Sequence, residues 1–456
     1  VERVLSLMSR FLTEAGYQVV LITDEPASTK DYPLAEGVKR EVLSGEIPAD
    51  YETLHGRTAR LREILERHQV DAVINNAWVS LSLFWDMAVV KATGAAFVNY
   101  CHGTFITALN NGIPIVSDNY RIGGMADAVV TLSHADSLYW GRVNRRVFQV
   151  TNPVTFSLET TPAAPLDSHR ILWLGRADSP DKNPRDAILI FKKVLECVPD
   201  ATLSMVGYIS PSLRRDYEKF CQAQGVAGHV EFPGYSTAVA DYFQRSAVLL
   251  QTSNFESFCM SIMESLASGV PVVCYEMPYL TVCRDSVAVT QVKWKDNLSA
   301  AEAITRILTE EDTRRSLGQA ARSEAQRLEN VDHVQVWRDI LESLLLPLPE
   351  REDEGIDRRD FADFMDEDGI VARQMCSAIR LNGDGSSGLD YCWEEPLFTN
   401  AQVTEMMQRI YDSKRYRIGK AVLFLPTKII TAVKILFLHG PGYMLRVAKE
   451  KLFPRK

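Results

Sequence analysis

The sequence Asn254-Phe-Glu-Ser-Phe-Cys-Met-Ser-Ile-Met-Glu264, continued by Ser265-Leu-Ala-Ser-Gly-Val-Pro-Val-Val-Cys-Tyr275, predicts a turn, a helix and a buried strand. Glu256 lies in the turn and Glu264 lies inside the helix, about 12 Å apart if the step is helical. The first N–H groups of a helix lack internal partners, and phosphate binds readily there. A helix N-terminus with a carboxylate on either side therefore suits a nucleotide sugar.

The rest of the first 345 residues alternates strand and helix signals. The first half predicts helices over 4–15, 58–68 and 81–93, and strands over 18–23, 70–75, 96–100, 128–132 and 147–150. The second half predicts strands over 170–174, 202–206, 230–232, 248–251 and 270–275, with helices at about 184–198, 213–224, 237–246 and 260–268. Further helices are predicted from about 298 to 345. Such alternation is typical of parallel sheets covered by helices. We predict an α/β fold of two Rossmann-like, doubly wound domains that face a cleft.

The predicted boundaries divide the chain into four segments. These are an N-terminal domain over 1–153, a second domain over 154–345 whose last helices pack back on the first, an acidic linker over 346–397, and a basic amphipathic helical extension over 398–456. The chain opens within a helix pattern, whereas a Rossmann half begins with a strand and a Gly-rich turn. The first strand and its turn are therefore expected to be missing.

The composition narrows the class of protein. The chain has 456 residues and a net charge of −9. An acidic body without a basic groove argues against nucleic-acid binding, and the lack of a Gly-x-Gly-x-x-Gly turn argues against a dehydrogenase. The eight cysteines form no Cys-x-x-Cys pair, which favours reduced core thiols. With neither a signal peptide nor a long uncharged apolar window, the sequence predicts a cytoplasmic protein.

The C-terminal end has a charge pattern of its own. Residues 414–456 contain eleven Lys or Arg and a single acid, Glu450. A basic amphipathic helix there would lie in the headgroup region of an anionic membrane, on the inner face of the plasma membrane. The alternative is a helical pair packed on the body of the protein, with its lysines facing water.

Five motifs resemble those of the retaining GT4 family of GT-B glycosyltransferases, and they occur along the chain in the same order as in that family. The Glu-x7-Glu segment over 255–273 is similar to the strongest motif of that family, and Leu174-Gly-Arg-Ala-Asp-Ser-Pro-Asp-Lys-Asn183 looks like its phosphate-binding loop. The three shorter matches are Val1-Glu-Arg-Val4, the end of a Gly-Gly-x-Glu-Arg motif; Cys101-His-Gly103; and the linker Val150-Thr-Asn-Pro153.

The resemblance implies roles for the catalytic residues. Arg176 and Lys182 would stabilise the charge that builds on the departing nucleoside diphosphate. Glu256 would contact hydroxyls of the transferred sugar, and Glu264 would contact the ribose. His102 would lie near the donor sugar and the reactive centre. Alternatively, Arg176 and Lys182 are solvated loop cations. Glu256 and Glu264 would then be a capping acid and an exposed helix acid, and His102 would be hydrogen-bonded within its own turn.

Further donor contacts are implied at strand ends and at the helix start. The backbone N–H groups of Phe258, Cys259 and Met260 would face the phosphates. The turns Gly207-Tyr208 and Gly234-Tyr235-Ser236 occupy the strand ends where the family holds its base, so Tyr208 and Tyr235 could pack against it. Ser257 stands where the family usually has Gly, and Cys259 stands where it often has Gly or Pro, so donor preference could differ.

The resemblance implies that a hexosyl-type sugar moves from a nucleotide-diphosphate donor to a glycan or lipid-linked acceptor, with retention of configuration. Surface polysaccharide synthesis is the expected setting. No cofactor and no metal are expected, since protein cations neutralise the diphosphate. The alternatives are a catalytically impaired GT-B subunit that only binds, and a sugar-nucleotide hydrolase or epimerase.

Overall fold

The computed structural model describes residues 1–28, 31–43, 51–77, 82–105, 122–277, 280–284 and 286–349. The chain divides into two compact units, Val1–Ala378 and Ile379–Lys456. Everything that follows concerns the first unit. The acidic linker from residue 350 onward, the basic extension and the predicted membrane-binding segment 414–456 lie outside the described residues.

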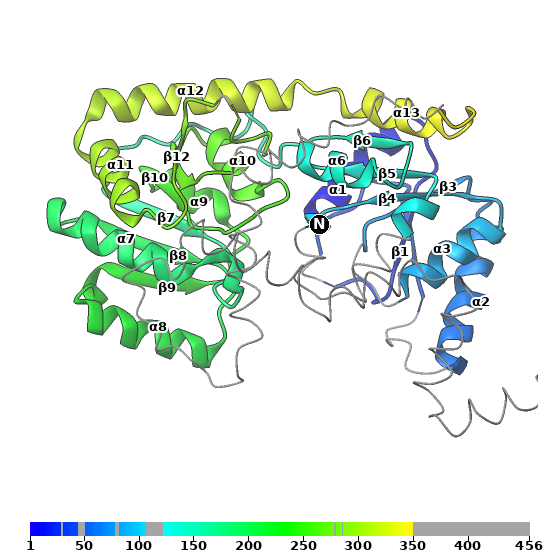
Figure 1. Ribbon diagram of the computed structural model, residues 1–456, viewed down its shortest axis with the longest axis horizontal. Helices are drawn as coiled ribbons and strands as arrows, with labels where there is room; N and C mark the ends of the chain where they lie inside the picture. Colours follow the sequence, from blue (N-terminus) through cyan, green and yellow to red (C-terminus); the bar gives the residue numbers. More distant parts are fainter. Residues whose placement is uncertain are drawn as a thin grey trace, which may run out of the picture. The chain divides into compact units, whose positions relative to one another are not determined.

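The first half of the unit contains two parallel sheets (Figure 1). Strands β1 and β2 form one, and the other has the order β3-β4-β5-β6. The elements are α1 (Glu2–Glu14), β1 (Val20–Thr23), β2 (Lys39–Val42), α2 (Tyr51–Arg67), β3 (Ala72–Asn75), α3 (Leu83–Ala92), β4 (Ala96–Tyr100), β5 (Ala128–Thr131), α6 (His134–Trp140) and β6 (Val147–Gln149).

The second half contains one parallel sheet with the strand order β12-β11-β10-β7-β8-β9. The order reverses between β7 and β10, and ligands of open α/β sheets bind at such a point. The elements are β7 (Arg170–Leu174), η1 (Pro180–Lys182), α7 (Pro184–Cys197), β8 (Thr202–Val206), α8 (Pro211–Gln224), η2 (Ala227–His229), β9 (Val230–Gly234), α9 (Val239–Gln244), β10 (Val248–Gln251), α10 (Met260–Ala267), β11 (Val272–Tyr275), β12 (Val289–Val292), α11 (Asn297–Thr309), α12 (Glu311–Glu329) and α13 (His333–Ser343).

The predicted strands and helices of both halves are confirmed in type and order. The elements that were not predicted are β2, α6, β12 and the two short 3₁₀ helices η1 and η2. Three of the four β2 residues are charged, so the strand lacks the alternation that marks a half-buried strand. Strand β1 pairs with β2 and belongs to a sheet separate from β3–β6, whereas a single Rossmann sheet was expected for this half.

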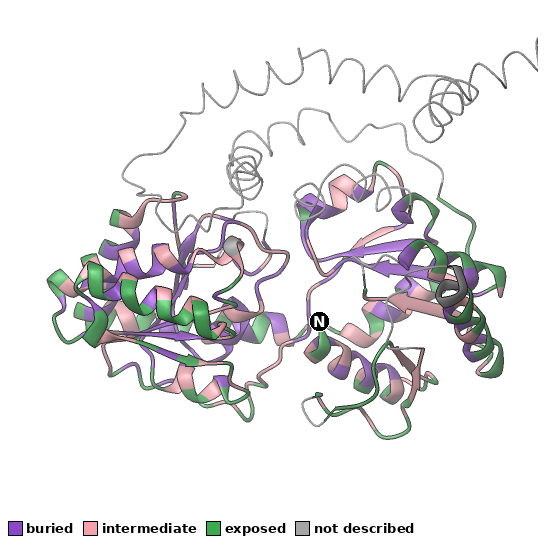
Figure 2. Cartoon of the chain, turned by 90° about the horizontal axis from the view of Figure 1, so that it is seen from below, coloured by how far each residue is buried: buried purple, intermediate pink, exposed green. Residues whose placement is uncertain are grey.

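The two halves share one hydrophobic core. Strands β4, β5, β10 and β11 lie at the centre of their sheets and are almost wholly buried (Figure 2). One continuous apolar cluster joins Val4 and Tyr100 of the first half to Phe258 and Met263 of the second. Because this cluster crosses from one half to the other, both apolar burial and polar contacts hold the two halves together.

Helix α13 packs against the first half, although it follows the second half in sequence. The ring of His333 stacks on Phe11 of α1 at 5.9 Å, and Trp337 meets Tyr100 edge-on at 5.3 Å. The Trp337 side chain is 2% exposed, so it anchors the helix in the shared core.

Within the described segments, no helix is long and apolar enough to span a bilayer.

Candidate functional site

The centre of the candidate site is an ion pair between Lys182 and Glu256. The Nζ of Lys182, at the end of η1, donates to Oε1 of Glu256, which also accepts from Ser253 Oγ at 2.7 Å. Their side chains are only 18% and 12% exposed. Burial acts to lower the pKa of Lys182, but the negative charges of Glu256 and Asp181 outweigh it and raise this pKa. Lys182 is therefore a fixed cation at neutral pH.

The loop that carries Lys182 is tied to the end of β10. Oγ1 of Thr252 donates to the carbonyl oxygen of Lys182 at 2.7 Å. The backbone N–H of Asn254 donates to the carbonyl oxygen of Asp181, also at 2.7 Å. Asn183 adopts a left-handed φ of 47° and donates from Nδ2 to the Thr252 carbonyl at 3.0 Å. The sequence analysis missed these residues, although an Asn just before a Pro-initiated helix is a usable signal.

Gly207 lets the same loop approach the end of β8. Its φ is +140°, and a Cβ built there would lie 1.8 Å from the carbonyl oxygen of Gly175. Gly175 donates its N–H to Val206 at 3.0 Å, and Ala177 donates to the carbonyl of Tyr208 at 2.9 Å. Gly207 thus has a steric role, because only glycine leaves room for this backbone contact.

Helix α10 begins without a side-chain cap from its N-cap residue. That residue, Cys259, has a left-handed φ of 65° and makes no capping hydrogen bond with its side chain. The side chains of Phe258 and Cys259 are 1% and 5% exposed, and Met260 Sδ accepts from Asn152 Nδ2 at 3.3 Å. At Phe258 and Cys259 only the backbone can therefore face a ligand. Burial also raises the pKa of the Cys259 thiol to about 12.

Glu264 is 4% exposed on α10, so it is not a solvated helix acid. Its Oε1 accepts from Arg3 Nη1 of α1 and from Thr155 Oγ1, the latter at 3.0 Å. Burial raises the pKa of Glu264, while Arg3 and Thr155 act in the opposite direction. Neither partner was predicted as a site residue, because Arg3 and Thr155 lie 261 and 109 residues from Glu264 in sequence and only the fold brings them to it.

His102 follows β4 and touches the Glu-x7-Glu turn through its backbone. Oγ of Ser257 donates to the His102 carbonyl at 2.5 Å. The ring Nε2 lies 2.7 Å from Oδ1 of Asn76, whose Nδ2 donates to the Ile74 carbonyl at 2.9 Å. Since that second bond orients the Asn76 amide, Nε2 of His102 must carry the proton. Burial lowers the pKa of His102 to about 3, so the ring is neutral.

The remaining predicted residues are exposed. Arg176 is exposed and donates to Ser179 Oγ at 3.4 Å. Tyr208 and Tyr235 are 51% and 65% exposed. The structure therefore brings Lys182, Glu256 and His102 into one linked site through the Glu-x7-Glu turn. It pairs Glu264 with Arg3 of the first half. Arg176 and both tyrosines are left accessible to solvent.

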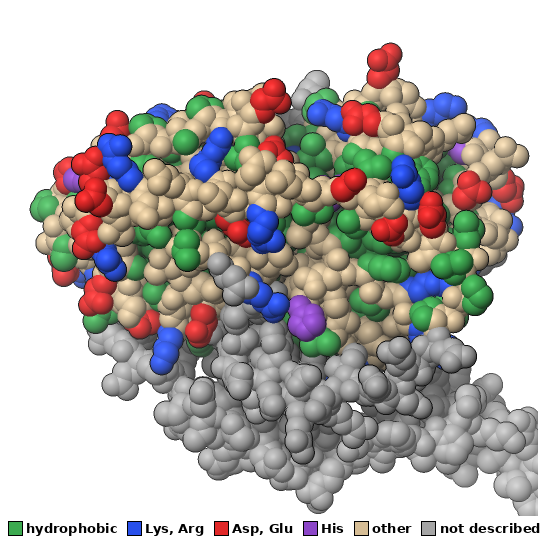
Figure 3. Space-filling model, turned by 90° about the horizontal axis from the view of Figure 1, so that it is seen from above, with side chains coloured by type: hydrophobic (Ala, Val, Ile, Leu, Met, Phe, Trp, Pro, Cys, Tyr) green, Lys and Arg blue, Asp and Glu red, His purple; other side chains and the backbone are tan. Residues whose placement is uncertain are grey.

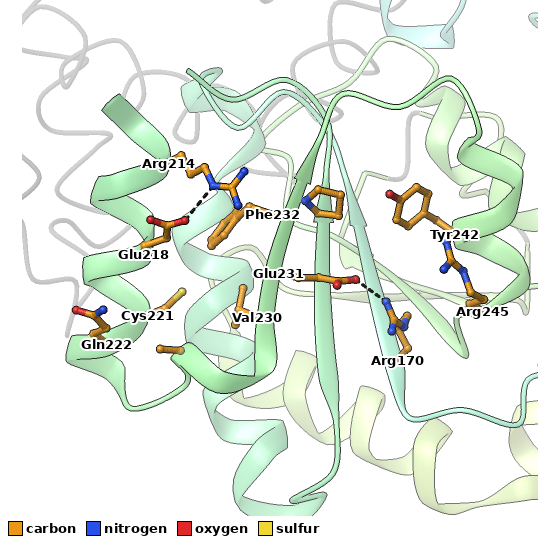
Figure 4. Close-up of a pocket in the computed structure, with 12 residues that line it drawn as sticks. Arg170, Arg214, Glu218, Cys221, Gln222, Val230, Glu231, Phe232, Tyr242 and Arg245 are labelled. Carbon is orange, nitrogen blue, oxygen red and sulfur yellow. Dashed lines mark hydrogen bonds and ion pairs between the residues drawn. The ribbon is translucent and has the colours of Figure 1, made fainter. Parts of the chain in front are cut away.

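A separate pocket of about 680 Å³ lies along the edge strand β9 (Figure 4). It includes no predicted site residue. Two of its arginines are paired with acids, Arg170 with Glu231 at 2.5 Å and Arg214 with Glu218 at 2.9 Å. The pocket thus presents mostly neutralised charge and is not part of the candidate site.

Surface charge and metal ligands add little to the site. Lys and Arg side chains are interspersed with Asp and Glu on the face shown in Figure 3. In the part of the chain that the structure describes, no group of three or more His, Cys, Asp or Glu side chains could hold a metal ion.

Two family models match the chain. "Glycosyltransferase Family 4" matches residues 1–154, and "Glycosyl transferases group 1" matches residues 160–324. The two matches meet near the linker that the sequence analysis placed around Pro153, and the second contains Lys182, Glu256 and Glu264. Together they take in both halves of the described unit.

The curated relatives match over part of their length. The poly(glycerol-phosphate) alpha-glucosyltransferase of Bacillus subtilis (strain 168) is 24% identical over 208 residues, which is 44% of this chain and 30% of that protein. The phosphatidyl-myo-inositol mannosyltransferase of Mycobacterium leprae is 32% identical over 162 residues, 34% of this chain and 41% of that protein. The chain thus spans less than half the length of these relatives.

Solved structures show the same fold. The Anabaena protein Alr3699/HepE, solved in complex with UDP and glucose, superposes with a TM-score of 0.61 at 14% identity, covering 76% of this chain and 96% of the Anabaena chain. At that identity the likeness concerns the fold, which is α/β with parallel sheets in both halves. With both family models matched in sequence order, this chain belongs to the GT4-like family of GT-B glycosyltransferases.

Proposed function

We propose that the protein is a retaining glycosyltransferase that moves a hexosyl-type sugar from a nucleotide-diphosphate donor to a glycan or lipid-linked acceptor. The observation that carries this proposal is the arrangement around α10. A buried cation, Lys182, lies beside Glu256 just before an uncapped helix start, and Glu264 lies one turn inside that helix. This set offers a cation, backbone donors and two carboxylates to one ligand.

Each part of the set matches a part of a nucleotide sugar. The backbone N–H groups at the start of α10 and the Lys182 ammonium suit the diphosphate. Glu256 suits the hydroxyls of the transferred sugar, and Glu264 suits the ribose. Because Lys182 is already held in place by Glu256, it can stabilise the charge of the leaving diphosphate with little reorganisation.

The chemical route in this proposal uses protein cations and the leaving group itself. Lys182, together with the exposed Arg176, would neutralise the departing diphosphate, so no metal and no other cofactor are required. An oxygen of that diphosphate would accept the proton of the acceptor hydroxyl on the face of attack, which retains the anomeric configuration. His102, neutral at physiological pH, would serve as a hydrogen-bonding group near the sugar.

The relatives support particular donor and acceptor classes as the first to test. UDP-sugars are the first donors to test, because the Anabaena neighbour was solved with UDP and glucose. The names of the curated relatives point to a polyol-phosphate polymer and to a phosphoinositide as acceptors, which supports surface polysaccharide or glycolipid synthesis as the setting. A cytoplasmic location, with membrane contact through residues 414–456, remains part of the proposal.

The first experiment measures ligand-induced stabilisation with a panel of UDP- and GDP-sugars. The matching donor is then incubated with glycan and lipid acceptors, with and without EDTA. We expect one donor class to raise the melting temperature and transfer to be insensitive to EDTA. Binding without turnover would instead support a non-catalytic subunit, and free sugar or an altered sugar nucleotide would support a hydrolase or an epimerase.

The membrane part has its own test. The full chain and a variant ending at residue 413 are sedimented with vesicles containing anionic phospholipid and, in parallel, with neutral vesicles. We expect only the full chain to bind, and only to the anionic vesicles, with binding lost at high salt. Equal binding by both proteins would assign the contact to another part of the chain.

A further inference from the structure

Arg3 on α1 contacts Glu264, the carboxylate that binds the ribose in the proposed function. Its Nη1 donates to Oε1 of Glu264, 261 residues away in sequence. The side chains of Arg3 and Glu264 are 23% and 6% exposed, so the pair is largely shielded from solvent. Such a pair is held far more firmly than a surface ion pair, and removing one partner leaves a buried charge without compensation.

Both side-chain donors to Glu264 use the same oxygen. Thr155 Oγ1 also donates to Oε1, at 3.0 Å. Among the described residues, the hydrogen bonds of Glu264 therefore converge on Oε1 and leave the acceptor capacity of Oε2 for a ligand. A carboxylate oxygen with open lone pairs accepts from the vicinal hydroxyls of a ribose.

Arg3 is itself held in one orientation. Its Nη2 donates to the hydroxyl of Tyr32 at 3.0 Å, and its guanidinium lies over the rings of Tyr32 and Phe156 at 5.1 and 5.8 Å. The planar fork of arginine can serve Glu264 and Tyr32 at once, which the single ammonium of a lysine cannot reproduce.

The electrostatics of the pair favour an ionised Glu264. Burial raises the pKa of this carboxyl, and Arg3 is the charged group that opposes the rise. The other polar group on the carboxylate, Thr155, is neutral. Without Arg3 the acid would hold its proton to a higher pH, and a protonated carboxyl is a poorer acceptor.

We propose that Arg3 is a positioning residue for the nucleoside of the donor, which keeps Glu264 ionised and directs its Oε2 toward the ribose hydroxyls. This inference rests on the proposed function of Glu264. It also gives α1 of the first half a part in recognising a ligand that lies mainly on the second half. Arg3 acts through Glu264, not by touching the ribose.

The test compares nucleotides with and without ribose hydroxyls. Calorimetry measures the affinity of the full chain for UDP and for 2′,3′-dideoxy-UDP, in the wild type, Arg3→Gln and Glu264→Gln. We expect Arg3→Gln to weaken UDP binding about 10- to 100-fold, the range of a hydrogen bond to a charged group. Binding of dideoxy-UDP should change less than about twofold, since the ligand lacks the hydroxyls that Oε2 would bind.

The pH profile separates this role from a purely structural one. Affinity for UDP should fall as pH decreases through the pKa of Glu264, and in Arg3→Gln that fall should begin at a higher pH. Arg10→Gln, an exposed arginine on the same helix, serves as the matched control and should behave as wild type. If Arg3→Gln folds poorly, Tyr32→Phe should show a smaller loss that again spares dideoxy-UDP.

Two results would overturn the inference in different ways. Equal losses for UDP and dideoxy-UDP in Arg3→Gln would show that Arg3 acts on the phosphates or on the fold, while the proposed function stands. A wild-type protein that binds no nucleotide or nucleotide sugar would remove the proposed function and this inference together.

Discussion

Lys182 donates a hydrogen bond to Glu256 across 74 residues of sequence. The two residues meet because β7 and β10, which lead into their loops, are neighbours at the point where the strand order reverses. The strand order therefore brings the cation and the carboxylate together. A diphosphate bound there would meet a cation whose position is already fixed.

Replacement of Lys182 by Met should abolish most transfer. We expect kcat/KM to fall about 10²- to 10³-fold, as when one transition-state donor is lost elsewhere. Glu256 would also lose its cation, so the melting temperature should drop. Because the pKa of Lys182 is raised above its ordinary 10.5, its contribution to stability is complete at neutral pH and is lost only as pH rises through the folded pKa. Lys193→Met, exposed on α7, is the control and should retain wild-type activity.

Gly207→Ala should disturb the Lys182 loop. The added Cβ would overlap the Gly175 carbonyl, so one of the two strand-end turns must move. We expect a loss of about 2–4 kcal/mol in unfolding free energy and weaker donor binding. Gly225→Ala isolates the backbone cost, because its φ is +75° and nothing lies within 4 Å of its Cβ. That control should lose only about 1 kcal/mol and bind donor normally; similar donor affinities for both variants would contradict the steric role of Gly207.

His102 should make stability depend on pH in acid. Its folded pKa is about 3, below its ordinary 6.5, so the unfolded chain binds the additional proton between these values. Stability should therefore fall as pH decreases from 6.5 toward 3. His102→Gln should flatten that part of the profile, measured by denaturant unfolding at several pH values. An unchanged slope in the variant would mean that His102 is already charged in the folded protein.

Cys259 should tolerate glycine better than alanine. Both substitutions remove the buried thiol, but only glycine also relieves the left-handed φ of 65° at the start of α10. Cys259→Gly should exceed Cys259→Ala in stability by about 1 kcal/mol, the usual cost of a Cβ in this region. Chemical denaturation of the pair measures this difference. Alanine matching glycine would indicate that the backbone at this position relaxes.

The order of strands and helices could be predicted from the sequence because buried parallel strands and amphipathic helices carry different apolar periods. The 170–174 and 202–206 strands matched to the residue for this reason. Strand β2 was not predicted, because a run of charged residues does not show the pattern of a strand. It forms a strand by pairing with β1, and the local sequence does not encode that contact. Short α6 has too few residues to establish a helical period.

The candidate site was predictable only where a motif lies within one segment. Glu256, Glu264 and Lys182 could be named from their loops, whereas Arg3, Thr155 and Asn76 could not be named as their partners. Local sequence does not report which side chain comes within 3 Å of another from a distant element.

The sequence by itself determined the family, the two-half α/β architecture and the positions of the two glutamates, because these depend on short-range patterns along the chain. Only the tertiary structure decided that Glu264 is buried against Arg3, that Lys182 is paired with Glu256, and that Gly207 makes room for Gly175. Those relationships arise when parallel strands bring distant loops to one end of a sheet and when a shared core joins the two halves. Burial and neighbouring charges then shift the pKa values of Glu264 and Lys182.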